Sequence, residues 1–145
     1  MVDTKPKLTT STTKPRVALC HDWLVARRGG ELVLEAIAEA VQPIAHLDIV
    51  FTMFDNGSSI GPAIDPLLRR PSFLNNWPAR RWLLPLYPLA VHDLSRKLRA
   101  RHRGKPYDLV ISTHSAAIKS IKPPPGVPHV CYCHAPARYI WTHAE

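Results

Sequence analysis

Four short apolar runs constrain the fold of this sequence more than any other feature, because each is too hydrophobic for a strand with one face in water. They read RVALCHDW from Arg16, HLDIVFTMF from His46, YDLVIS from Tyr107 and HVCYC from His129. Strands buried on both faces belong to parallel sheets covered by helices. Helical or irregular segments separate the runs, so the sequence predicts an α/β fold with a Rossmann-like parallel sheet flanked by helices.

The first helix is predicted directly after the first strand. Gly29-Gly30 forms a tight turn, Glu31 opens the helix and Pro43 closes it. Glutamates recur on one face and apolar residues on the other, which predicts an amphipathic helix packed on the sheet. The glutamates are Glu31, Glu35 and Glu39, and the apolar residues are Val33, Ile37, Ala40 and Val41.

The middle of the chain, from residue 55 to residue 88, is Pro-rich and irregular. It predicts a short strand at Ser72 to Leu74 and a short helix around Ala79 to Leu84. Apolar residues at helical spacing predict a second long helix from Pro88 to Gly104. A further short helix is predicted over Ser115 to Ile121.

The composition indicates how the chain is divided into domains and what kind of partner it binds. Residues 1–15 are rich in Thr, Lys and Pro, which predicts a disordered leader before one domain at 16–145. Lys and Arg outnumber Asp and Glu by 19 to 11, and the net charge of +8 favours an anionic partner. The sequence shows neither a spanning segment nor a signal peptide, so we expect a cytoplasmic protein. The three cysteines, odd in number, are expected to be free thiols.

Histidines end three of the predicted strands. His21, His114 and His134 each come at or just after a strand. Ligands of open α/β sheets bind outside the carboxyl ends of the strands. A single such histidine is more commonly structural, but three of them predict polar groups that face one cleft.

Two other motifs have alternative interpretations. Gly29-Gly30 at a strand-to-helix turn allows backbone N–H groups to approach a phosphate, although such glycines more often serve the turn alone. The GxGxxG and P-loop patterns are missing from the sequence, which disfavours nicotinamide and ATP-hydrolysing functions. Zinc held by Cys20, Cys131, Cys133 and neighbouring histidines is disfavoured because CxC in a buried strand lacks the usual spacing. No metal or cofactor is expected.

A basic block covers the end of the second long helix. Residues 96–105 hold six Lys and Arg and no acid, after the Trp- and Leu-rich run WPARRWLLPLYPLAV. This pattern favours a helix on an anionic membrane surface, with a solvated helix face as an equal alternative. The surface cations are Arg96, Lys97, Arg99 and Arg101. No nucleic-acid-binding module is recognised, so nucleic acid is not expected as a partner.

Five segments together resemble the N-terminal domain of family 4 glycosyltransferases, the retaining, two-domain GT-B class, and especially its bacterial mannosyltransferase-like members. The segments are VALCHDWLVARRGGELVLEAIAE, PSFL, LLPLYPLAV, YDLVISTHSAAIKSI and PPGVPHVCYCHAPARYIW. The resemblance implies an enzyme that moves a sugar, with mannose from GDP-mannose preferred, to a saccharide or lipid-linked acceptor. It also implies a role in cell-surface polysaccharide synthesis, at the inner face of the plasma membrane.

The resemblance assigns roles to individual residues. It implies that Gly29 and Gly30 face the donor diphosphate and that His134 lies beside the donor sugar as the catalytic-site residue. Front-face transfer needs no protein nucleophile, and none is expected. The implied acceptor or cleft residues are His21, Asp22, His114, Lys119 and Arg138.

The family's second Rossmann-like domain, which binds the nucleotide, is expected to be missing because the sequence ends at Glu145. We therefore expect the chain to transfer sugar poorly by itself. The alternative function is a non-catalytic α/β module that binds a membrane or a partner domain through its basic, Trp-bearing helix.

Overall fold

Five parallel strands form one sheet within residues 13–113 and 117–134, the part of the chain that the computed structural model describes. The strand order across the sheet is β3-β2-β1-β4-β5. The strands are β1 (Arg16–Leu24), β2 (His46–Asp55), β3 (Leu68–Pro71), β4 (Leu109–Thr113) and β5 (His129–Tyr132). The predicted α/β class with a Rossmann-like parallel sheet is confirmed.

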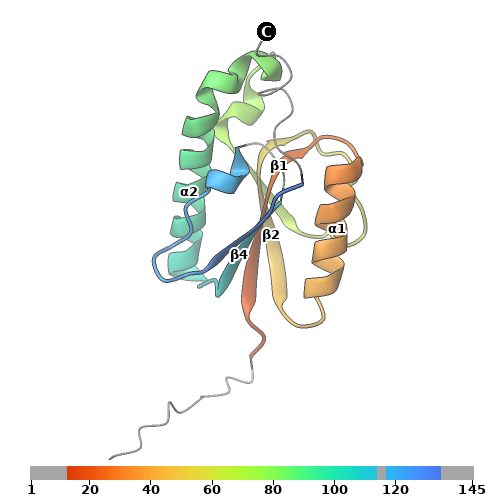
Figure 1. Cartoon of the computed structure of the whole chain (residues 1–145), viewed down its shortest axis with the longest axis vertical. Helices are drawn as coiled ribbons and strands as arrows, with labels where there is room; N and C mark the ends of the chain where they lie inside the picture. Colours follow the sequence, from red (N-terminus) through yellow and green to blue (C-terminus); the bar gives the residue numbers. More distant parts are fainter. Residues whose placement is uncertain (1–12, 114–116, 135–145) are drawn as a thin grey trace, which may run out of the picture.

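Helices cover both faces of the sheet. Helix α1 (Gly29–Val41) lies on one face and α2 (Tyr87–Gly104) on the other, with the sheet between them (Figure 1). Alternation along the strands produces two cores: Val17 and Leu19 pack beneath α1, whereas Ala18 and Cys20 pack beneath α2. Both faces of the central strands are therefore apolar, as their continuous hydrophobic runs predict.

The prediction that the glutamates of α1 all lie on its solvent-facing side is corrected, because two of them are buried. The buried residues of α1 are Glu31, Leu34, Glu35 and Ala38, whereas Ala40 is exposed. Burial of Glu35 has two causes. Arg27 donates a hydrogen bond to its Oε2 at 2.8 Å, and Gly61 leaves room where a Cβ would collide with the carboxylate.

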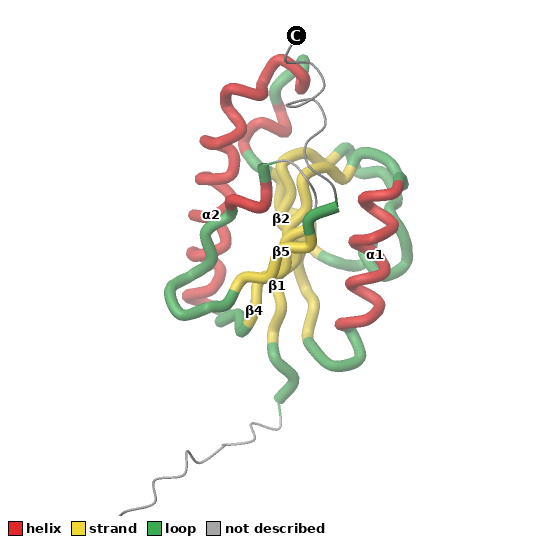
Figure 2. Tube along the Cα trace, viewed as in Figure 1, coloured by secondary structure: helices red, strands yellow, loops and turns green. Residues whose placement is uncertain are grey.

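The segment between β2 and α2 contains the other corrections. The predicted strand at Ser72 to Leu74 is wrong: Ser72 instead caps the 3-10 helix η1 (Phe73–Asn76), where its Oγ accepts the Leu74 N–H. The added strand β3 lies just before it. The short helix predicted around Ala79 is confirmed as the 3-10 helix η2 (Arg80–Leu86), and α2 follows at once (Figure 2).

The remaining short helix lies between β4 and β5. Within the predicted range Ser115 to Ile121, the structure describes a 3-10 helix η3 (Ile118–Ser120). This helix packs on the α2 side of the sheet, where Ile118 and Ile121 join the core. It thereby comes close to the end of β1, which carries the first predicted site residues.

Candidate functional site

The carboxyl edge of the sheet joins two of the predicted histidines through one threonine. His21 of β1 is fully buried, and its Nδ1 lies 2.7 Å from the carbonyl oxygen of Thr113 at the end of β4. The hydroxyl of the same Thr113 lies 2.7 Å from Nε2 of His134, just beyond β5. His21 and His134 therefore meet at one residue, Thr113, which sequence reasoning missed. His21 is fully buried, however, so it does not face a cleft as predicted, and its role toward a ligand stays a prediction.

Asp22 lies next to His21 and has a clear structural task. Its side chain is fully buried, and Oδ1 accepts the Ile118 N–H at 2.8 Å. Its carbonyl oxygen accepts the Thr52 hydroxyl at 3.1 Å. Asp22 therefore fixes η3 against the end of β1. Lys119, another predicted acceptor contact, is exposed on the same short helix.

The two glycines form the first residues of α1, which corrects the prediction of a turn that precedes a helix opening at Glu31. The first bond of the helix runs from the Leu32 N–H to the Arg28 carbonyl at 2.9 Å. Neither Gly29 nor Gly30 has a positive φ, and a Cβ on Gly29 would meet nothing within 4 Å. The fold therefore does not require glycine at 29. Since the space beside Gly29 is empty, a ligand can approach the start of α1 at this residue.

Two predicted site residues, His114 and Arg138, lie outside the described residues. The remaining site residues come from β1, α1, η3 and the end of β5. Since all five strands are parallel, their carboxyl ends lie along one edge, where ligands bind in sheets of this kind.

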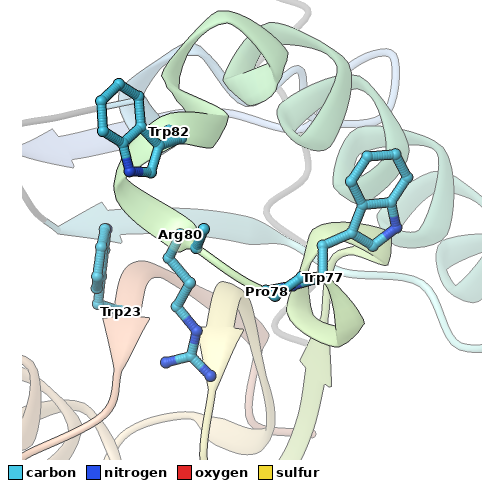
Figure 3. Close-up of a pocket in the computed structure, with 6 residues that line it drawn as sticks. Trp23, Trp77, Pro78, Arg80 and Trp82 are labelled. Atoms are coloured by element: carbon cyan, nitrogen blue, oxygen red, sulfur yellow. The ribbon is translucent and has the colours of Figure 1, made fainter.

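An open hollow of about 590 Å³ lies on the same edge, and sequence reasoning missed it. Its lining consists of Trp23, Trp77, Pro78, Ala79, Arg80 and Trp82. Trp23 and Trp82 lie at one end, Trp77 lies at the other, and Pro78 and Arg80 lie between them (Figure 3). The signal in the sequence was the unusual concentration of tryptophan and arginine in NNWPARRW.

Phe54 packs against two of the residues that line the hollow, Trp23 and Arg80. Its ring lies 5.0 Å from the Trp23 ring and 5.3 Å from the Arg80 guanidinium carbon. Ala79 precedes Arg80 in the left-handed conformation, with φ 56° and ψ 52°. A non-glycine residue in that region carries a strain of roughly 1–3 kcal/mol, and such strain is concentrated at functional sites.

The cysteines are free thiols, as predicted, but only one is buried. Cys131 and Cys133 are exposed, which differs from the apolar strand context expected for them. Burial raises the pKa of the Cys20 thiol far above its usual range, so Cys20 stays protonated and is a poor nucleophile. Among the described residues no three His, Cys, Asp or Glu side chains form a group that could hold a metal ion.

The four basic residues predicted to face a membrane do not form one patch of unpaired cations. Arg101 pairs with Asp48 at 3.0 Å, and Lys97 pairs with Asp93 at 2.8 Å. Arg96 keeps 76% of its side chain exposed, and Arg99 donates to the Ser95 carbonyl. Within the described ranges, no helix has both the length and the apolar character needed to cross a membrane.

Comparison with protein-family models, curated proteins and solved structures finds no match to this chain.

Proposed function

We propose that this chain is the acceptor-side domain of a retaining glycosyltransferase that takes mannose from GDP-mannose. The observation that carries the proposal is the linkage of His21, Thr113 and His134 at the carboxyl edge. The open first turn of α1 begins on the same edge. The proposal is supported because an imidazole oriented by Thr113 and the N-terminus of α1 lie at the edge where α/β sheets bind ligands.

The chemistry needs such groups. In a retaining, front-face transfer, the acceptor oxygen forms a bond to the anomeric carbon while the bond from that carbon to the phosphate oxygen breaks. The acceptor proton passes to the departing phosphate. Negative charge grows on the diphosphate, and the N–H groups of Gly29 and Gly30 are suited to stabilise it. His134, oriented by Thr113, supplies a contact to the donor sugar.

The acceptor in this proposal is a saccharide or lipid-linked saccharide used in cell-surface polysaccharide synthesis. The apolar surface between Phe73 and Leu89 supports a site that opens toward lipid. Its exposed members, the 73–89 apolar surface, are Phe73, Trp77, Trp82, Leu84 and Leu89.

Amide NMR of the isotope-labelled chain tests the proposal. The nucleotide contacts are expected from the second domain, so only the diphosphate and sugar contacts remain on this chain. We therefore expect GDP-mannose at millimolar concentration to shift the signals of Gly29, Gly30 and His134, while mannitol at equal concentration leaves them unchanged. Gly29→Val should abolish the shifts without loss of fold, because a side chain there meets open space. Gly104→Val is the matched control, since its Cβ also meets nothing, and it should bind like the parent. Parent-like binding by Gly29→Val would contradict the proposal.

A second candidate function, a non-catalytic membrane-binding module, is favoured by the 73–89 apolar surface. Trp and Leu side chains beside arginines suit the interface of an anionic bilayer. Trp82 is 85% exposed and Leu89 is 56% exposed, with the exposed Arg96 further along α2.

Sedimentation with vesicles tests this second function. We expect the chain to pellet with phosphatidylglycerol vesicles and to stay in solution with phosphatidylcholine alone. A Leu84→Ser and Leu89→Ser double variant should pellet less. If the double variant pellets like the parent, the membrane-binding function is wrong.

A further inference from the structure

We infer that the hollow between Trp23 and Trp82 is the subsite for the saccharide ring of the acceptor. The inference rests on the proposed function, since it names where one substrate of that reaction lies. The family resemblance assigns no individual role to the residues that line this hollow, and the histidine linkage does not include them.

The first argument is the exposure of two indoles on one short segment. Trp82 is 85% exposed and Trp77 is 49% exposed, although each ring has a large apolar area to bury. The left-handed backbone at Ala79 lies between them and sets the direction of the chain into η2. Large aromatic surfaces held open by a strained backbone are typical of a binding site.

The second argument is the chemistry of the lining. Indole faces attract the apolar C–H face of a pyranose ring, and the guanidinium of Arg80 and the indole N–H groups donate hydrogen bonds. A purely apolar ligand would leave the donors of Arg80 unpaired, which carries a desolvation penalty. A small anion would leave the indoles in water. A sugar ring satisfies both kinds of group.

The third argument is size and position. A volume of about 590 Å³ lies within the range of small-molecule sites and has room for a sugar. Trp23 pairs in register with Phe54 and directly follows His21 and Asp22 along β1. A saccharide on Trp23 is therefore close to the edge where the proposed donor sugar lies.

The test uses the whole chain and α-mannobiose as the probe. We expect mannobiose to shift the indole N–H signals of Trp23 and Trp82 in NMR spectra. Trp82→Ala should weaken this binding about tenfold, and Trp82→Phe should recover most of it. Ile44→Ala is the matched control, because Ile44 is an exposed apolar residue outside the lining and outside the 73–89 apolar surface, and it should bind like the parent.

The outcomes separate this inference from the proposed function. If GDP-mannose shifts Gly29 and Gly30 but mannobiose shifts no indole signal, the subsite is wrong and the proposed function stands. If mannobiose binds through Trp82 but GDP-mannose does not reach α1, the saccharide site stands and the proposed function fails. Indole shifts produced by GDP and not by mannobiose would show a nucleobase site and overturn the inference.

Discussion

The two ends of the sheet differ in how their polar and aromatic groups are used. At the amino end, Asp48 accepts hydrogen bonds from Arg16 at 2.7 Å and from Arg101 at 3.0 Å. Arg101 also donates to the Tyr107 hydroxyl at 2.8 Å, and Arg16 lies over the Tyr107 ring. These four residues, the amino-end cluster, find partners in one another, although among the described residues the second carboxylate oxygen of Asp48, Oδ1, is buried without a hydrogen-bond partner.

The carboxyl end also contains buried, hydrogen-bonded groups such as His21 and Asp22, but it differs in its surface. The Trp82 indole lies in solvent, Gly29 faces empty space at the start of α1, and Ala79 is held in a strained conformation. Under the proposed function, the amino-end cluster supplies stability and the carboxyl edge supplies binding. Substitutions at the two ends should therefore separate the free energy of unfolding from ligand binding.

The largest effect is expected at Asp48. Asp48→Ala leaves Arg16 and Arg101 without their shared carboxylate, and we expect the free energy of unfolding to fall by about 2 kcal/mol. Urea unfolding followed by circular dichroism measures the loss. Donor and mannobiose binding should stay unchanged under conditions where the variant is folded. A variant with the stability of the parent but weakened binding would contradict the assignment of Asp48 to stability.

A smaller effect of opposite sign is expected at Ala79. Ala79→Gly removes the cost of the left-handed conformation, so we expect the free energy of unfolding to rise by about 0.5 kcal/mol. Greater freedom of the backbone should at the same time weaken mannobiose binding. Thermal unfolding and the NMR titration measure the two quantities. A loss of stability would show that the strain assigned to this residue is absent.

A modest pH dependence is expected from His129, at the amino end of β5. Burial lowers the pKa of its imidazole, and its Nε2 lies 2.8 Å from the Ser112 hydroxyl. Below the ordinary value of 6.5 the unfolded chain binds more protons at this site, so stability falls as the pH falls. His129→Gln should have a flatter stability profile between neutral and mildly acidic pH. An unchanged profile would refute the assignment to His129.

The smallest effect on stability is expected at Trp82. Its ring is 85% exposed, so Trp82→Ala should change the free energy of unfolding by less than about 0.5 kcal/mol. Urea unfolding provides the measurement. A larger loss would mean that the indole is part of the folded core, and the carboxyl edge would then share the structural task of the amino end.

Local patterns predicted the fold class well because both faces of β1, β2 and β4 are apolar. β3 was missed since Leu68–Pro71 reads LRRP, which is half polar and lies at the sheet edge. The buried face of α1 was predicted only in part. Ile37 and Val41 pack against the core as expected, but Glu35 is buried as well, because its partners Arg27 and Gly61 lie outside the helix. A periodic pattern within one helix contains no information on such partners.

The candidate site was predictable only where it follows strand ends. His21 and His134 could be placed on one edge because parallel strands end together, but their link through Thr113 depends on side-chain geometry. The hollow joins Trp23 with Trp82 from distant parts of the chain, and no local rule pairs them. The roles of Gly29, Gly30 and His134 toward a donor stay predictions.

The most direct test of the central claim is the amide NMR titration with GDP-mannose, read at both ends of the sheet at once. If the carboxyl edge binds the donor, the signals of Gly29, Gly30 and His134 shift and those of Asp48 and Arg101 do not. Unchanged signals at the carboxyl edge, or shifts confined to the amino-end cluster, would contradict this claim.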